Sequence, residues 1–213
     1  STVGEGSGGF NVRGGNVDQN LILQEGVPLF NPSHALGFYS VFNADAVEKI
    51  TLNKGHVPAQ FGGRLSSVLD VKLKDANRLD WKGSGSIGMI SSKLVLEAPL
   101  VKDKLSVLFG GRQSYTGWIL RQLDNKAVSK SAARFGDLLL KATWRLNQKT
   151  TLRAFGTVTD DYFRYARDFG YSWRNLQLGL QGDMLHNQRF STQVSAALSR
   201  YAGTQFDPGG ADA

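Results

Sequence analysis

Regular alternation of apolar and polar residues in the C-terminal two thirds of the chain is the feature that most restricts its fold. The clearest segment places Leu176, Leu178, Leu180, Gly182 and Met184 on one side, and Asn175, Gln177, Gly179, Gln181 and Asp183 on the other. Successive side chains of a β-strand point to opposite faces, so this period of two indicates a strand with one apolar and one polar face.

Seven segments of this kind follow one another, at residues 81–90, 93–100, 105–115, 136–146, 152–159, 175–184 and 190–199. The turns at 101–104, 147–149 and 186–188 are short, whereas the connections at 116–134 and 160–173 are longer. Strands of roughly ten residues, with short turns at one end and longer loops at the other, are typical of outer-membrane barrels. A soluble β-sandwich also alternates, but it rarely keeps strands so long.

Aromatic residues near the expected strand ends agree with a membrane barrel, because they suit the aromatic girdles at the two membrane interfaces. They are Trp81, Tyr115, Trp118, Trp144, Tyr162, Trp173 and Tyr201. The sequence contains no run of 18 apolar residues, which excludes a membrane-spanning helix but not a spanning barrel.

The charge of the chain is unevenly distributed. The net charge of +7 divides into −1 over residues 1–76, from six basic and seven acidic side chains, and +8 over the remainder. The basic residues stand singly along strands and loops instead of forming a patch with aromatic residues, which argues against nucleic-acid binding. Cysteine is absent, so the chain can form neither a disulfide framework nor a thiolate metal site.

The first 76 residues have the pattern of a small mixed α/β domain. A strand is expected at 20–23, with Glu25 and Gly26 as its turn, followed by a long aromatic-containing loop over 27–42. Asn43 has the character of an N-cap, which predicts a short helix over 44–48.

The stretch 55–75 marks the change of architecture. Pro58 and the pair Gly62 and Gly63 predict a tight bend, because proline removes a backbone donor and glycine allows a close approach of the backbone. Alternation then begins at Ser67 and predicts a half-buried strand.

Four pieces of this N-terminal part resemble, in the same order, the plug domain of TonB-dependent outer-membrane receptors, particularly the forms of Bacteroidetes-type bacteria. They are Phe-Asn-Val-Arg-Gly-Gly at 10–15, Asn-Leu-Ile-Leu-Gln-Glu-Gly-Val-Pro at 20–28, Val-Glu-Lys-Ile-Thr-Leu-Asn-Lys-Gly at 47–55 and Pro-Ala-Gln-Phe-Gly-Gly at 58–63. The last piece leads into Val-Leu-Asp-Val at 68–71. The family usually has Asp-Gly where this chain has Glu25 and Gly26, a difference that matters little to a turn.

The resemblance implies an all-β transmembrane barrel with a small α/β plug domain inside its lumen. The family's barrel has about 22 strands, a size at which the lumen is wide enough to need a plug. We therefore expect residues 1–76 to be a plug domain that is incomplete at its N-terminal end. Residues 77–213 would be the first strands, about seven, of a barrel that is incomplete at its C-terminal end.

The resemblance also implies two sets of site residues. Family receptors pair plug arginines with glutamates of the barrel wall, and here Arg13 and Arg64 lie in the matching plug motifs, while Glu97 is the sole glutamate after residue 76. The alternation places Glu97 in the lumen, where it would either hold the plug or be solvated by water. Plug loops at the outer end face the incoming solute in the family, so contact candidates are Phe30, Asn31, His34, Phe38 and Tyr39; alternatively, these side chains wedge the plug against the wall.

The function that the resemblance implies is active transport of a scarce solute across the bacterial outer membrane. Its energy would come from TonB with ExbB and ExbD, and its further partners would be outer-membrane lipid, the solute itself (a small molecule, glycan, peptide or metal chelate) and a surface lipoprotein of SusD type. The protein would be integral to the outer membrane, with its plug facing the periplasm. Two alternatives stay open, a structural or docking subunit of an outer-membrane assembly with the same fold, and a soluble all-β binding module.

No catalytic constellation is visible in the sequence. The histidines His34, His56 and His186 are far apart and lack metal-ligand spacing. We therefore expect no enzyme activity, no cofactor and no metal site.

Overall fold

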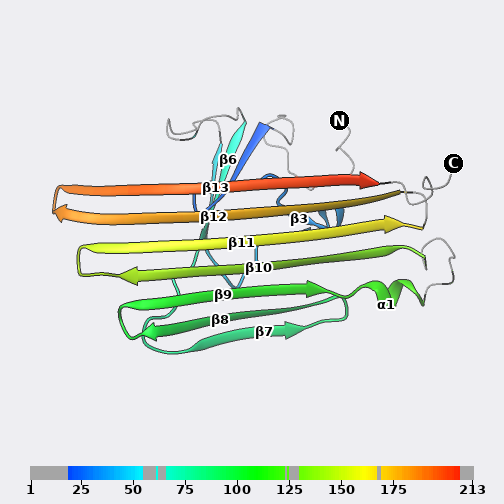
Figure 1. Ribbon diagram of the computed structural model, residues 1–213, viewed down its shortest axis with the longest axis horizontal. Helices are drawn as coiled ribbons and strands as arrows, with labels where there is room; N and C mark the ends of the chain where they lie inside the picture. Colours follow the sequence, from blue (N-terminus) through cyan, green and yellow to red (C-terminus); the bar gives the residue numbers. More distant parts are fainter. Residues whose placement is uncertain are drawn as a thin grey trace.

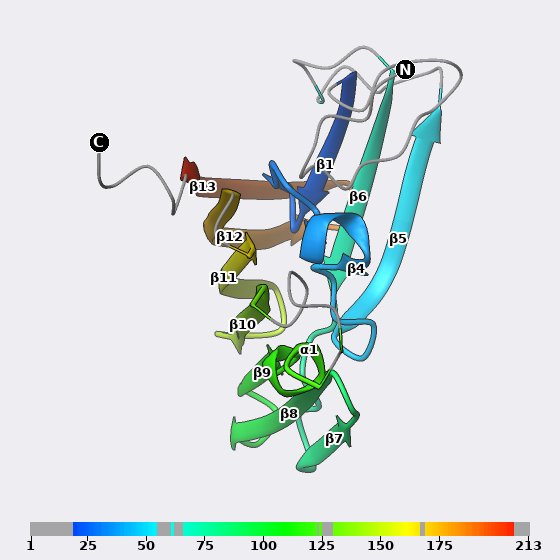
Figure 2. The ribbon, with the colours of Figure 1, turned by 90° about the vertical axis from the view of Figure 1, so that its right-hand side faces the viewer.

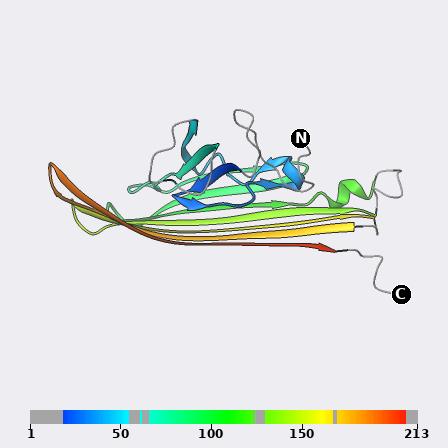
Figure 3. The same ribbon diagram turned by 90° about the horizontal axis from the view of Figure 1, so that it is seen from above.

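Two sheets of very different size make up most of the fold, and the short strands β3 (Ser33–His34) and β4 (Tyr39–Ser40) form a third, two-stranded sheet. The structure is a computed structural model that describes residues 19–54, 61, 66–122, 124, 130–166 and 169–206. A seven-stranded antiparallel sheet runs across the molecule in Figure 1, and a four-stranded sheet is formed by residues before 74. Figures 2 and 3 show that the small sheet and its loops lie against one face of the large one.

The large sheet, here called the wall, contains its strands in the order of the sequence. They are β7 (Lys82–Ile87), β8 (Ser91–Val101), β9 (Leu105–Ser114), β10 (Ala132–Arg145), β11 (Thr150–Tyr165), β12 (Phe169–Asn187) and β13 (Phe190–Phe206). The expectation of seven strands is thus confirmed, and the helix α1 (Gly117–Leu120) lies in the connection between β9 and β10. Among the described residues, no helix has the length and apolar character needed to cross a membrane.

The loop predicted at 160–173 is wrong. Strands β11 and β12 continue through this region and pair residue by residue from Asp160 opposite Arg174 to Tyr165 opposite Phe169. The apolar and polar alternation stops there because aromatic and charged side chains occupy both faces, so the sequence pattern resembles a loop although the backbone hydrogen bonds of the ladder continue.

The two faces of the wall differ as the alternation predicts. In β10, the side chains of Leu138, Leu140 and Trp144 are about half exposed, whereas those of Lys141 and Thr143 on the opposite face are buried. The small sheet covers this second face, so the polar face of the wall is the inner one. The apolar face remains open along the whole sheet, as in a strand surface that contacts lipid.

The small sheet has the strand order β2-β1-β6-β5. It comprises β1 (Asn20–Gln24), β2 (Val27–Pro28), β5 (Val47–Lys54) and β6 (Ser67–Leu73), and β1 is parallel to β6. Glu25 and Gly26 both have positive φ, 54° and 79°, in the two-residue turn between β1 and β2. This confirms the predicted turn, because such tight hairpins need positive φ at both central residues.

Between β2 and β5 the chain forms short pieces, β3 (Ser33–His34), the 3₁₀ turn η2 (Ala35–Gly37) and β4 (Tyr39–Ser40). The helix predicted at 44–48 is wrong. The Asn43 side chain does accept a hydrogen bond from the Asp45 N–H at 3.1 Å, but the chain makes a single turn there and enters β5 at Val47. Asparagine favours such local turns as strongly as it favours helix caps.

A small apolar core joins the two sheets. Ala46, Leu73 and Ala76 from the N-terminal part pack with Val95, Leu108 and Leu139 of the wall, and Phe155 packs against this group. A second cluster, Ile22, Leu29 and Val41 with Phe42 and Leu69, lies within the N-terminal part. Outside this core, polar groups and a few aromatic rings make the contact between the N-terminal part and the wall.

Candidate functional site: the polar contact between the two sheets

The imidazole of His34 is held between two carboxylates of the wall. Its Nδ1 lies 2.6 Å from Oδ2 of Asp161 in β11, and its Nε2 lies 3.2 Å from Oδ2 of Asp137 in β10. The side chain is 0% exposed, and those of Asp137 and Asp161 are 5% and 2% exposed. Asp161 also accepts a hydrogen bond from the Ala35 N–H at 3.0 Å, so it binds the plug-side backbone as well.

Because an ionised carboxylate only accepts hydrogen bonds, both ring nitrogens of His34 must donate, which requires the positively charged imidazolium. Burial by itself lowers the pKa of His34, but the hydrogen bonds and negative charges of Asp137 and Asp161 outweigh it and raise the pKa above its usual 6.5. The ring is therefore a charged link between the small sheet and the wall.

Arg112 completes this group, here called the outer cluster (His34, Arg112, Asp137 and Asp161). Its Nε donates to Oδ2 of Asp137 at 2.7 Å, and its Nη2 donates to the Ser40 carbonyl at 2.6 Å. Phe135 stacks on the His34 ring with centroids 4.7 Å apart, and the Arg112 guanidinium lies 5.5 Å from the same phenyl centroid. Two positive and two negative groups thus balance in a largely dry site.

A second ionic group lies toward the opposite end of the strands and is here called the inner cluster (Glu25, Asp75, Lys141, Arg153 and Asp183). The Lys141 ammonium lies 2.9 Å from Oδ1 of Asp75, 2.9 Å from the Leu73 carbonyl and 3.4 Å from Oε1 of Glu25. These three acceptors all belong to the N-terminal part, so a wall lysine, only 4% exposed, directs all its donors to that part.

Asp75 is the centre of the inner cluster. Besides Lys141, it accepts from Oγ1 of Thr143 at 3.0 Å and from Nε of Arg153 at 3.3 Å. Arg153 also pairs with Asp183 of β12. Burial raises the pKa of Asp75, but the hydrogen bond and charge of Lys141, the charge of Arg153 and the Thr143 hydroxyl together hold it below the usual value of 3.8.

Between the two clusters, wall amides and hydroxyls bind backbone carbonyls of the small sheet. Nε2 of Gln177 donates to the carbonyls of Val27 and Pro28 at 3.0 and 2.9 Å, and the Ser199 hydroxyl donates to Pro28 at 2.7 Å. In the reverse direction, Nε2 of Gln24 donates to Oγ1 of Thr157 at 3.0 Å. Proline at 28 is therefore the point where two wall strands bind the tight hairpin.

The five plug-loop candidates differ in burial and in their contacts with the wall. His34 is buried in the outer cluster, and the Asn31 carbonyl accepts from Nδ2 of Asn175 at 3.3 Å. Tyr39 packs against Phe135, with centroids 5.2 Å apart. By contrast, Phe30 is 54% and Phe38 is 83% exposed. His34, Asn31 and Tyr39 thus contact the wall, and the Phe30 ring lies 6.4 Å from that of Tyr201, while the contact of the five with solute stays a prediction.

Glu97 lies on the inner face, as its alternation predicts. Its register partners are Lys82 and Leu108, and its Oε2 accepts a hydrogen bond from the Asn77 N–H at 2.7 Å. It thus binds the segment that connects the two sheets. Arg13 and Arg64 lie outside the described residues, so their pairing with Glu97 stays a prediction.

Sequence reasoning did not single out the residues that carry most of the contact, Asp75, Arg112, Asp137, Lys141, Arg153 and Asp161. Arg112, Asp137, Lys141 and Arg153 lie on the polar side of an alternating segment, and that position was the available signal. Asp161 lies in the stretch 160–173, which was predicted as a loop. Nothing in the one-dimensional pattern shows which polar wall residue meets which plug residue. No group of the described residues has an arrangement of His, Cys, Asp or Glu that could hold a metal ion.

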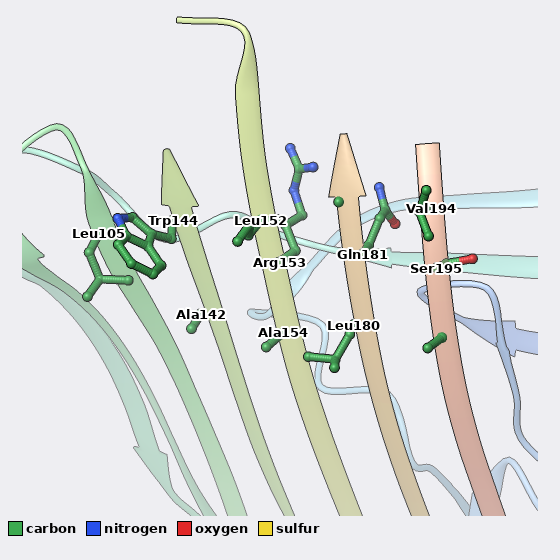
Figure 4. Close-up of a pocket in the computed structure, with 12 residues that line it drawn as sticks. Leu105, Ala142, Trp144, Leu152, Arg153, Ala154, Leu180, Gln181, Val194 and Ser195 are labelled. Atoms are coloured by element: carbon green, nitrogen blue, oxygen red, sulfur yellow. The ribbon is translucent and has the colours of Figure 1, made fainter. Parts of the chain in front are cut away.

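The apolar outer face has a hollow of its own, shown in Figure 4. It is lined by side chains from β9 to β13, among them Leu105, Trp144, Leu152, Leu180 and Val194. This hollow lies on the face away from the small sheet, and Arg153 of the inner cluster also borders it.

Comparisons with known proteins identify the N-terminal part. Residues 1–67 match the family model described as the TonB-dependent receptor plug domain. No curated protein matches the sequence.

Solved structures with the same fold include a siderophore receptor, a copper transporter and an outer membrane transporter. The siderophore receptor PirA from Pseudomonas aeruginosa is 14% identical over 92% of this chain and 35% of its own, with a TM-score of 0.66. The copper transporter OprC is 16% identical over 92% and 32%, with a TM-score of 0.64. The outer membrane transporter YddB from Escherichia coli is 14% identical over 86% and 32%, with a TM-score of 0.59.

This chain thus spans about a third of the length of these structures. The family match and the shared fold confirm the resemblance to TonB-dependent receptors, whereas the Bacteroidetes-type assignment stays a prediction.

Proposed function

We propose that this chain, which carries a TonB-dependent receptor plug domain and has the fold of those receptors, is part of a transporter that imports a scarce solute across the bacterial outer membrane. The observation that carries the proposal is the position of the plug residues. They cover the polar face of a membrane-type sheet whose opposite face is apolar and open. A plug in that position obstructs the lumen, so passage requires that it move.

The chemistry of the contact suits a plug that must be held and then released. Buried ion pairs lose much of their Coulomb attraction to desolvation, so they add less net stability than an apolar contact of similar area. They nevertheless fix one position, because every charge that leaves its partner stays uncompensated in a dry site. The outer and inner clusters would therefore align the plug without bonding it irreversibly.

The proposed mechanism has three steps. The solute binds at the outer end, above the described plug loops, where Phe38 and Phe30 are the exposed candidates. TonB, energised with ExbB and ExbD, then pulls on the plug from the periplasm. The ionic clusters separate, water solvates the freed charges, and a path opens along the polar inner face of the wall.

A plug arginine paired with Glu97 would add a further breakable contact beside the segment that leads from plug to wall, where Glu97 binds the Asn77 backbone. Arg13 and Arg64 are the candidates. Substituting Glu97→Gln keeps the side-chain shape but removes the charge. An unchanged force for plug release under periplasmic pulling would exclude this pairing.

The experiment that tests the function compares the growth of two strains, one that carries the natural polypeptide and one in which it is deleted. Growth is limited in turn by each of four nutrients, an iron chelate, cobalamin, a glycan and a peptide. Transport predicts a growth defect for one nutrient, and the same defect when TonB is deleted instead. Normal growth on every nutrient, with the protein still in the outer membrane, would favour the structural or docking role.

A further inference from the structure

The hollow on the outer face has a flat, small-residue floor. Ala142 pairs with Ala154, Ala154 with Leu180, and Leu180 with Ala196, so small side chains occupy most of one row across four strands. In the next row Gly182 lies between Leu152 and Val194. A Cβ added at Gly182 would lie 3.3 Å from the Leu152 side chain, so this position has little room for a larger residue.

Large apolar side chains stand around this floor. Trp144 is 49% exposed, and Leu152, Leu180 and Val194 are similarly open. The hollow encloses about 520 Å³, within the range of about 300–1,000 Å³ usual for sites that hold small molecules. Arg153, Gln181 and Ser195 also border it, but the surface that it exposes is mainly hydrocarbon, which suits an apolar chain better than a polar solute.

Basic side chains border the hollow at one end. Each of the three turns at that end of the wall carries an exposed cation, Lys102 and Lys104 between β8 and β9, Lys149 between β10 and β11, and Arg189 between β12 and β13. None of these four forms an ion pair with another described residue, whereas Lys141 and Arg153 inside the wall do.

The distances along the strands suit one amphipathic molecule. Lys104 is adjacent to Leu105, and Lys149 is three residues from Leu152, or roughly 10 Å at about 3.3 Å per residue. Leu105, Trp144 and Leu152 lie side by side in register and line the hollow. An anionic head group at the turns would thus place its chain directly over the apolar floor.

We propose that this hollow is a binding site for an anionic phospholipid of the membrane leaflet at the short-turn end. The acyl chain lies over Ala142, Ala154 and Gly182 between Trp144 and Leu180, and the phosphate binds the cations of the turns, chiefly Lys149 and Arg189. Clustered Lys and Arg beside a membrane surface attract anionic lipid in this way. The proposal rests on the outer-membrane location proposed above, but not on solute transport.

The experiment measures lipid binding to the intact natural polypeptide in a neutral detergent by native mass spectrometry. Phosphatidylglycerol and phosphatidylethanolamine are the two probes, since they share acyl chains and differ in net charge. We expect phosphatidylglycerol to bind at least tenfold more tightly. Equal affinities would overturn the proposal, as would a protein that needs no detergent, which would also exclude the membrane location.

Two sets of variants locate the site. The double substitution Lys149→Gln with Arg189→Gln should weaken phosphatidylglycerol by about 10- to 30-fold, whereas Arg200→Gln, at the opposite end of β13, should not. Ala154→Phe on β11 should fill the hollow and weaken both lipids, whereas Ala202→Phe, exposed on β13 and outside the hollow, should not. If the Phe variant fails to assemble, the charge variant still decides, and phosphatidylglycerol affinity unchanged in that variant would overturn the proposal.

Discussion

The Nδ1 atom of His34 lies 2.6 Å from the carboxylate of Asp161, across the boundary between plug and wall. Since Asp137 accepts from the other ring nitrogen, one protonated imidazole connects two wall strands to the plug. The contribution of this contact to plug docking therefore depends on the protonation of His34.

Replacing His34 with Phe should weaken plug docking by about 3 kcal/mol, because two buried carboxylates lose a charged partner while ring stacking on Phe135 is kept. Hydrogen exchange of the β1 and β6 amides in the intact protein measures the change. His186→Phe is the control, because His186 is exposed and binds only Thr192 among the described residues. Equal protection in both variants would contradict the role of His34.

Docking of the plug on the wall should also weaken at alkaline pH. The pKa of His34 is raised in the folded protein, so its stabilising contribution is complete below about 6.5 and is lost as the pH rises through the higher folded value. The groups that face the ring are Asp137 and Asp161, with Arg112 on Asp137. Exchange rates of plug amides, corrected for their intrinsic pH dependence, should rise over that window in the natural protein and stay flat in His34→Phe.

The inner cluster should lose its stabilising contribution to docking at acidic pH. The pKa of Asp75 is lowered in the folded protein, so its contribution is present above about 3.8 and is lost as the pH falls through the lower folded value. Asp75→Asn should remove this acid transition and leave the alkaline one. A variant that loses both transitions would show that the two clusters do not act separately.

Lys141→Met should destabilise the docked plug by about 3–5 kcal/mol, because Glu25 and Asp75 lose their buried partner. Lys82→Met provides the control at an exposed wall lysine and should change stability by less than about 0.5 kcal/mol. Protease cleavage of the plug in the intact protein, followed over time, distinguishes the two. Similar cleavage rates would mean that the lysine contributes little.

Gly179→Ala should disturb docking without changing any charge. A Cβ at this position would lie 2.1 Å from the Phe155 ring, which packs against the apolar core between plug and wall. Overpacking of this kind costs about 1–3 kcal/mol. Gly156→Ala, whose new Cβ would lie 3.2 Å from the Leu178 side chain on the apolar face and 3.9 Å from the Gln177 carbonyl oxygen, should leave plug exchange unchanged.

The alternation in the sequence was enough to predict the number of wall strands and which face of β10 and β12 is polar. A period of two that is kept over about ten residues indicates a β-strand with two different faces. The turn at Glu25 and Gly26 was predictable for a similar local reason. The continuation of β11 and β12 through Asp160 and Trp173 was not, since it depends on the ladder between the strands.

The partners of His34 show why the site could not be read from the sequence. Asp137 and Asp161 are 103 and 127 residues away along the chain, and only the packing of the plug on the wall brings them together. A histidine in an aromatic loop resembles a solute contact equally well. Its burial is a tertiary property that local pattern does not encode.

The most direct test of the account is a cross-link between plug and wall in the natural polypeptide, with any cysteine outside this cysteine-free sequence first replaced. Gln24→Cys with Thr157→Cys places two thiols where Nε2 of Gln24 lies 3.0 Å from Oγ1 of Thr157. The account predicts rapid linkage by a short bifunctional thiol reagent in isolated outer membranes, and slow linkage of Gln24→Cys with Ser191→Cys at the start of β13. No linkage of the first pair, or equal linkage of both, would contradict a plug docked on the polar face of the wall.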